Sequence, residues 1–138
     1  MKRNAIVLGI GIAAFLSSSM PAMAGTVIGF DDAITDPITW HMPTGYGGLE
    51  WSSRWGVMSG DYYGDSPSGY ANGVMSGGYV AFNSMGSPVT ISRDSPFVFV
   101  GAYFTAAWQD GLQIDVEGYL DGELLYSTTF TVNTYKPT

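Results

Sequence analysis

The stretch FVFVGAYFTAAWQDGLQIDVEGYLDGELLYSTTFTV, residues 97–132, decides the predicted fold. Its first four residues, 97–100, are aromatic or β-branched without alternation, a pattern typical of a strand covered on both faces. After Gly101 seven apolar residues share the even-numbered positions between 102 and 116, whereas Gln113, Asp115 and Glu117 fall on odd ones. Because side chains alternate along a strand, we expect a hairpin with one wet face. The stretch therefore predicts a meander of antiparallel strands.

Two turns divide this stretch, at residues 109–111 and 120–122, and both have Asp second and Gly third. Gly tolerates positive φ, and Asp can bond nearby backbone amides. A two-residue loop at the second turn would place apolar residues opposite polar ones, whereas a three-residue loop places Leu112 opposite Phe130. Both turns therefore predict a three-residue loop closed by a left-handed glycine bulge.

Residues 1–24 have the organisation of a secretory signal peptide. Lys2 and Arg3 precede an apolar run over residues 5–16, and small residues lead to Ala24. A run of about a dozen apolar residues is shorter than the roughly 20 needed to span a bilayer, so we expect no stable membrane insertion after cleavage. The sequence predicts a secreted bacterial protein: periplasmic, extracellular or at the cell surface.

Residues 25–138 are expected to form a single domain. The chain has no cysteine, so no disulfide framework supports it. Its formal net charge is −7, and removal of the leader leaves three basic and twelve acidic residues, a charge of −9. Nucleic acid needs a cationic surface, so no nucleic-acid partner is predicted. Nineteen glycines, abundant aromatic residues and the lack of helical periodicity favour an all-β sandwich or barrel.

Outside the central stretch, the sequence predicts short strands separated by loops. Residues 26–30 are expected to form a first strand that ends at Asp31 and Asp32, and residues 78–83 a later one. Residues 59–70, SGDYYGDSPSGY, have the composition of an exposed loop. Three glycines around Tyr46 predict unusual backbone there. In all, we expect six to eight short strands.

Five segments together resemble a family of uncharacterised exported bacterial proteins of the PEP-CTERM-associated type: GFDD (29–32), TGYGGLEW (44–51), SGYANG (68–73), GYVAFN (78–83) and AYFTAAWQDGL through TTFTVNT (102–134). The resemblance implies an antiparallel β-sandwich of the jelly-roll, galactose-binding-like type, and it implies no established activity.

The sequence departs from that family in two ways. It has no C-terminal sorting tail, and it stops where the family pattern predicts one or two more strands. The chain is therefore expected to be either a fragment lacking its last strands or a short variant with an open sheet edge. Such an edge favours self-association.

Calcium is the predicted cofactor, as a structural ion at Asp31 and Asp32. Similar jelly rolls often hold calcium where carboxylates and loop carbonyls meet, and calcium prefers oxygen ligands. The alternative, that both aspartates are solvated or cap a turn, remains open. Asp61 and Asp65 are weaker candidates.

A glycan or exopolysaccharide is the predicted partner. Sugar sites combine flat apolar faces with a few hydrogen-bonding groups. The candidate ligand-binding residues are Trp55, Tyr62, Tyr63, Tyr46 and Tyr70. Of these we expect Trp55, Tyr62 and Tyr63 to be exposed, and we assign Trp51 and Trp108 to the core. A packing role is the alternative for each single aromatic residue.

The sequence predicts no enzyme. His41 is the only histidine, there is no thiol, and no G-x-S-x-G elbow occurs. The leading hypothesis is a secreted, non-catalytic binding module for exopolysaccharide or cell-surface glycan, stabilised by calcium. The alternative is a structural protein of the extracellular matrix or cell surface that acts through protein–protein contacts.

Overall fold

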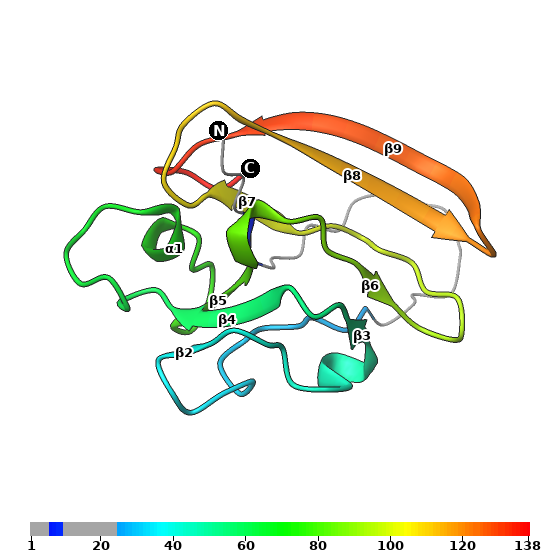
Figure 1. Ribbon diagram of the computed structural model, residues 1–138, viewed down its shortest axis with the longest axis horizontal. Coiled ribbons are helices and arrows are strands. Elements are labelled where there is room, and N and C mark those ends of the chain that lie inside the picture. The colour runs from blue at the N-terminus through cyan, green and yellow to red at the C-terminus, as the bar shows by residue number, and fades with distance from the viewer. Residues whose placement is uncertain (1–5, 10–24) are drawn as a thin grey trace.

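The computed structural model describes residues 6–9 and 25–138, and its regular structure is almost entirely β (Figure 1). The strands are β1 (Ile6–Gly9), β2 (Ile38–Thr39), β3 (Glu50–Trp51), β4 (Trp55–Ser59), β5 (Tyr79–Asn83), β6 (Ile91–Ser92), β7 (Tyr103–Ala106), β8 (Leu112–Leu120) and β9 (Glu123–Val132). The short helices are η1 (Tyr46–Gly48), α1 (Gly69–Asn72) and η2 (Ser84–Gly86).

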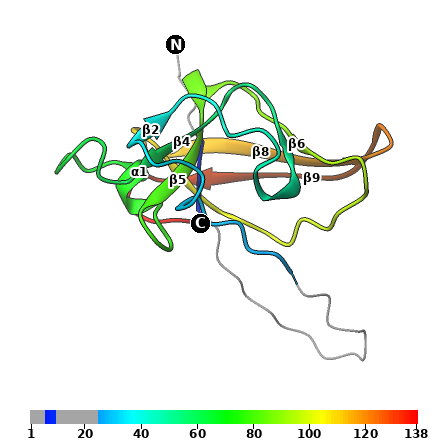
Figure 2. The same cartoon turned by 90° about the horizontal axis from the view of Figure 1, so that it is seen from below.

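The strands form three sheets, and all of their pairings are antiparallel. One sheet has five strands in the order β2-β4-β5-β1-β7, and β3–β6 and β8–β9 form two-stranded sheets. The prediction of an all-β, antiparallel chain is confirmed. In Figure 2 the long β8–β9 hairpin runs across the molecule, with α1 near one of its ends.

Strands β4 and β5 form the centre of the five-stranded sheet and have apolar residues on both faces. Val57 lies opposite Ala81, and both belong to a cluster formed with Phe30. On the other face, Met58 packs with Phe82. The sheet is covered on both sides, which explains why these strands are apolar without a wet face.

Helix α1 replaces the last part of the loop predicted at residues 59–70. Residues 61–67 are exposed, but Ser68 is buried and caps the helix by accepting a hydrogen bond from the Ala71 amide (3.3 Å). Gly69 docks on β7, where its carbonyl accepts from Thr105 Oγ1 at 2.9 Å. The expected exposure is therefore wrong for the part of the loop that anchors to the sheet.

In the β8–β9 hairpin the predicted alternation of polar and apolar residues is confirmed, but the predicted three-residue loop is wrong. Gln113, Asp115 and Glu117 are exposed and Leu112 is buried, as the alternation predicts. The loop, however, is a two-residue turn, in which Leu120 pairs with Glu123.

A bulge makes this shorter turn compatible with an apolar register. Pairing shifts between Gly118 and Tyr119, since Gly118 lies opposite Tyr126 while Tyr119 lies opposite Leu124. Leu125 is thus an extra residue on β9. Beyond it, Ile114 lies opposite Phe130, so apolar residues meet without the predicted three-residue loop.

Three expected elements are different in the structure. Residues 97–100 form no strand and are exposed, residues 26–30 form no strand, and β7 does not pair with β8 across the turn at residues 109–111. On one edge β7 pairs with β1, and backbone bonds join Phe104 to Thr138. Because the edges of β7 are used in this way, the meander does not continue from β7 into β8.

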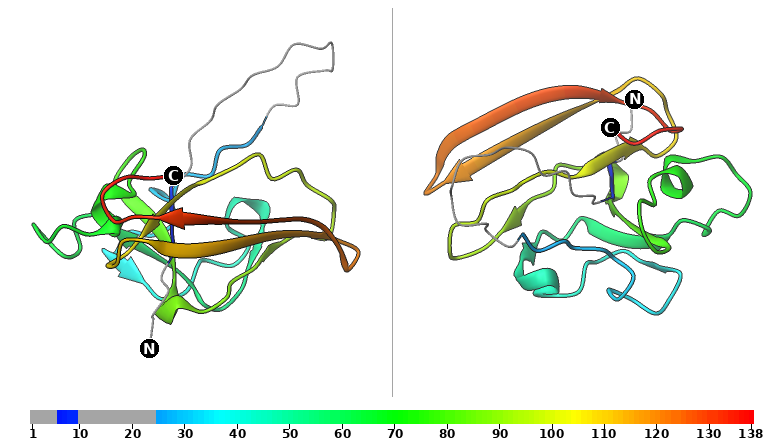
Figure 3. Two further views of the ribbon diagram at one scale, coloured as in Figure 1. Left: turned by 90° about the horizontal axis from the view of Figure 1, so that it is seen from above. Right: turned by 180° about the vertical axis from the view of Figure 1, so that it is seen from behind.

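The base of the hairpin packs on β7 through a small apolar cluster. Ala106, Leu112, Ile114 and Val132 are buried in it. The turn end of the hairpin lies on the side of the molecule opposite α1, as Figure 3 shows from above and from behind. The buried residues of the hairpin therefore lie near its base.

The predicted signal peptide lies outside the described residues, except that Ile6–Gly9 form β1. Within residues 6–9 and 25–138, no helix has the length and apolar character needed to cross a bilayer.

Candidate functional site

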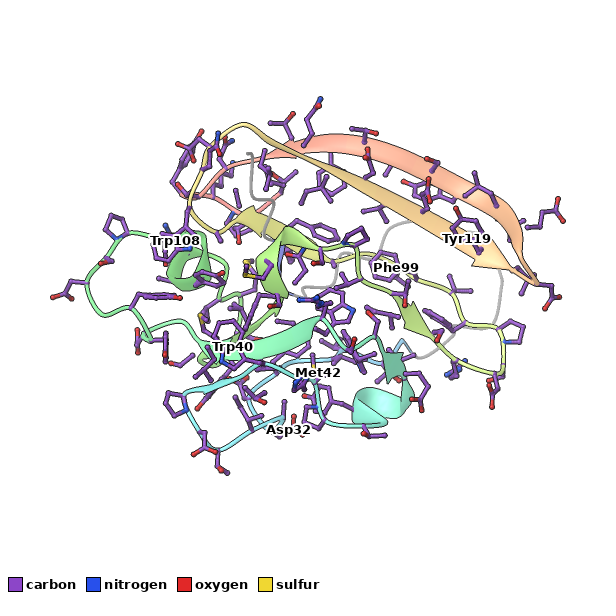
Figure 4. The ribbon with its side chains drawn as sticks, in the orientation of Figure 1. Asp32, Trp40, Met42, Phe99, Trp108 and Tyr119 are labelled. Atoms are coloured by element: carbon purple, nitrogen blue, oxygen red, sulfur yellow. The ribbon has the colours of Figure 1, made fainter. Side chains whose placement is uncertain are left out.

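Two of the predicted metal ligands and one predicted aromatic residue line the same open pocket, of about 360 Å³. Its lining residues are Thr26, Val27, Ile28, Gly29, Asp31, Asp32, Tyr46 and Gly47. The pocket joins the segment before β2 to helix η1. Figure 4 places Asp32 at the edge of the molecule that lies farthest from the hairpin.

Asp31 is held by the loop before β5. Its Oδ1 accepts a hydrogen bond from the Gly78 amide at 2.6 Å. The preceding Gly77 has φ +63°, and a Cβ built there would lie 1.8 Å from Asp31 Oδ2. Only glycine gives both this backbone conformation and the space for the carboxylate.

Tyr46 links the pocket to the aromatic core. Its hydroxyl lies 2.5 Å from Asp32 Oδ1 and also within hydrogen-bond distance of the Gly29 carbonyl. Its own carbonyl accepts from Trp51 Nε1 at 2.8 Å. Gly45 and Gly47 on either side have φ of +70° and +64°, as the glycine pattern predicts.

Tyr46 stays protonated because of its surroundings. Burial raises the pKa of its hydroxyl well above the usual value, and the hydrogen bond to Asp32 and the negative charges of Asp32 and Asp31 raise it further. The hydroxyl therefore acts as a donor to these oxygens and not as a base.

The pocket fits calcium in the kind of donor but not in the number. Asp31 and Asp32 supply carboxylate oxygens, which calcium prefers, but calcium takes roughly six to eight oxygens. Among the described residues, no group of three or more acidic, histidine or cysteine side chains is placed to hold a metal ion. Any further ligands would have to be water or backbone oxygens.

A second candidate site is formed by three exposed rings, which we call the aromatic corner: Tyr62, Tyr63 and Trp108. The ring centroids of Tyr63 and Trp108 are 4.8 Å apart with an interplanar angle of 75°, and those of Tyr62 and Tyr63 are 5.0 Å apart at 89°. The exposed fractions are 42%, 38% and 54% in the order given. The rings thus present faces in different directions and not one flat platform.

Trp108 was expected in the core, and this prediction is wrong. Strand β7 ends at Ala106, so the alternation that would turn Trp108 inward no longer applies. Figure 4 shows Trp108 beside α1. Its position next to the predicted turn at residues 109–111 is the sequence signal that could have indicated exposure.

Tyr70 lies beneath the corner and is only 6% exposed. Its ring packs on Tyr63 (5.6 Å) and Trp108 (5.7 Å). Burial, and to a lesser degree Tyr63, raises the pKa of Tyr70 to about 12. Tyr70 therefore supports the corner and presents little surface of its own.

Trp55 was expected to be exposed, but it is 4% exposed and belongs to the core. Its ring meets Trp51 edge-on at 5.3 Å, and its Nε1 donates to the Thr90 carbonyl at 3.0 Å. A direct role in ligand binding does not fit this burial. Trp51 packs against the same core cluster, as predicted.

The remaining polar candidates are separate from the pocket lining. Asp61 and Asp65 are exposed on the loop that carries Tyr62 and Tyr63. His41 is exposed, and its Nδ1 lies 3.0 Å from the Ser53 carbonyl.

No family model matches this chain, and neither a curated protein nor a solved structure matches it.

Proposed function

We propose that this protein is a secreted, non-catalytic module that binds exopolysaccharide or cell-surface glycan at the aromatic corner. The observation that carries the proposal is that Tyr62, Tyr63 and Trp108 are exposed neighbours. The ring centroid of Tyr63 lies 5.0 Å from that of Tyr62 and 4.8 Å from that of Trp108. Exposed aromatic rings supply apolar faces for sugar rings. Asp61 and Asp65 on the same loop supply hydrogen-bond acceptors for hydroxyl groups.

Affinity electrophoresis through gels that contain acidic or neutral polysaccharides tests this proposal. We expect retardation in at least one gel, and we expect Trp108→Ala and Tyr63→Ala to abolish it. Tyr135→Ala is the matched control, because Tyr135 is 66% exposed but does not belong to the corner. Equal mobility of the wild-type protein in every gel, or equal loss of retardation in the control, would contradict the proposal.

Calcium is a subsidiary part of the proposal. Asp31 and Asp32 would hold the ion, and the ion would tie the segment before β2 to the loop before β5. A ligand that binds only the folded state raises the melting temperature. We expect calcium to raise it and a chelator to reverse the rise. Asp31→Asn should remove the effect, whereas Asp36→Asn, on the same exposed loop but outside the pocket, should keep it.

The proposed architecture is a jelly-roll sandwich. The two-layer packing of the hairpin base on β7 supports it, and so does the resemblance described above.

A structural role through protein–protein contacts is the second candidate, and the turn half of the hairpin favours it. Its exposed apolar residues are Tyr119, Leu120, Leu124, Leu125 and Tyr126, with exposed fractions from 41% to 63%. Exposed apolar residues gathered at one end of a hairpin are a feature of interaction sites. Assembly that depends on protein concentration and needs no glycan would favour this function over the first.

A further inference from the structure

Strand β1 fills a gap in the five-stranded sheet. It pairs antiparallel with Ala81 and Phe82 of β5 on one side and with all of β7 on the other. In the part of the chain that the structure describes, β5 and β7 are not neighbours in the sheet. Cleavage after Ala24, as the sequence predicts, would separate β1 covalently from the domain. Two strand edges would then face each other across the width of one strand, a distance of about 10 Å.

The backbone groups and apolar side chains that border this gap determine which kind of molecule can fill it. Each edge offers backbone N–H and C=O groups, and burying such groups without hydrogen-bond partners destabilises the folded protein. Neither β5 nor β7 contains a charged residue, and Ala81, Phe82 and Ala106 are buried. An occupant must therefore bond to both edges at the spacing of a strand and must also be apolar. An extended polypeptide meets both demands, whereas a sugar or a lipid does not.

The residues that precede β7 extend the same edge. Residues 97–100 have the sequence of a strand but lie outside every sheet, with exposed fractions from 41% to 78%. Strand β1 runs antiparallel to β7, and Gly9 lies opposite Tyr103. A strand that continued past the position of Gly9 would therefore run along residues 97–100. In the view of Figure 4, Phe99 lies between the hairpin and the lower sheet. The Arg93 guanidinium stacks on the Phe97 ring at 5.6 Å and holds the beginning of this segment.

We propose that the gap between β5 and β7 is an acceptor site for an extended apolar segment of a second polypeptide chain, which replaces β1 and continues along residues 97–100. Strand β1 is itself a segment of this chemistry, Ile-Val-Leu-Gly, seated between the two edges. The site is distinct from the aromatic corner, so this inference does not depend on glycan binding.

The test uses the full chain with a protease site inserted between Ala24 and Gly25. After folding, the chain is cut and incubated with a fluorescent peptide of the sequence of residues 4–11, NAIVLGIG, carrying two extra lysines for solubility. The control peptide has proline in place of Leu8, which removes one N–H and the strand conformation. The uncut chain is the second control, because its own β1 fills the gap.

We expect the cut protein to take up one peptide per chain, the uncut chain to take up none, and the proline peptide to bind at least tenfold more weakly. Hydrogen exchange should then be slow in β5 and β7, and a peptide that is longer by five apolar residues at its C-terminus should also slow exchange at residues 97–100.

The proposal would be overturned by equal binding of both peptides, by uptake into the uncut chain, or by dimers of the cut protein that exclude the peptide. Exchange protection of β5 and β7 without any peptide would also overturn it, because the two edges would then have closed on each other.

Discussion

At the scale of single residues, the contact between α1 and β7 depends on the absence of a side chain at Gly69. A Cβ there would lie 1.8 Å from the Ala106 carbonyl oxygen, which is backbone and cannot turn away. We expect Gly69→Ala to lower the free energy of unfolding by about 2 to 3 kcal/mol, because the helix must move off the strand. Urea denaturation measures this. Gly78→Ala is the control, since a Cβ at Gly78 meets nothing within 4 Å. A similar loss in both variants would contradict the explanation.

Tyr70 makes stability depend on pH in the alkaline range. Its pKa is raised from 10 in the unfolded chain to about 12 in the folded one. The stability linked to the protonated phenol is therefore fully present below pH 10 and is lost as the pH rises through 12. We expect the wild-type protein to lose roughly 1 kcal/mol more than Tyr70→Phe between pH 8 and pH 11, because phenylalanine keeps the ring but cannot ionise. Urea denaturation at both pH values measures the difference, and parallel losses in the two proteins would refute it.

At the scale of elements, the bulge at Leu125 sets the register of the hairpin. Deleting Leu125 should leave Ile114 opposite Phe130, because the extra residue alone is lost, and should change the free energy of unfolding by less than about 1 kcal/mol. Deleting Thr131 instead cannot keep both Phe130 and Val132 on the inner face. Since Val132 is fully buried, we expect that deletion to cost about 2 kcal/mol more. Urea denaturation of both variants measures this, and equal losses would show that the bulge does not set the register.

The same elements show what alternation along a strand can predict. The apolar run at residues 78–83 and the polar face of β8 follow from local pattern, and the structure confirms both. The pattern could not show the bulge, because a bulge changes the register without changing the composition of either strand. Nor could it show that residues 97–100 lie outside every sheet, since a strand forms only where another edge is present to pair with it.

At the scale of the whole molecule, the candidate sites join segments that are far apart in the sequence. The sequence predicted Tyr62 and Tyr63 as exposed, which the structure confirms, but it placed Trp108 in the core and Trp55 outside it. Local pattern could not predict that the Asp31 carboxylate would meet the Gly78 amide, 47 residues away. Such contacts depend on how the sheets pack, and a single sequence does not contain that information in any one segment.

The net charge of the molecule and the exposed apolar residues of the hairpin have opposite effects on association between copies of the chain. The chain has a formal net charge of −7, so copies repel one another at low ionic strength, whereas the apolar turn half of the hairpin favours contact between copies. Salt shortens the screening length from about 30 Å at 0.01 M to about 8 Å at 0.15 M. If the hairpin is an association surface, as the second candidate function requires, salt should promote assembly of the purified protein in sedimentation velocity runs at increasing protein concentration.

A pair of variants separates the two effects. Leu125→Glu adds one negative charge and removes an apolar side chain that is 63% exposed, whereas Gln113→Glu adds the same charge on the wet face of β8. We expect Leu125→Glu to abolish the salt-promoted assembly and Gln113→Glu to shift it only to higher salt. An equal effect of the two substitutions would mean that charge alone governs association, and this would contradict the proposal that the hairpin is an interaction surface. Assembly that is lost only in Leu125→Glu would give the structural role direct support, independent of any result at the aromatic corner.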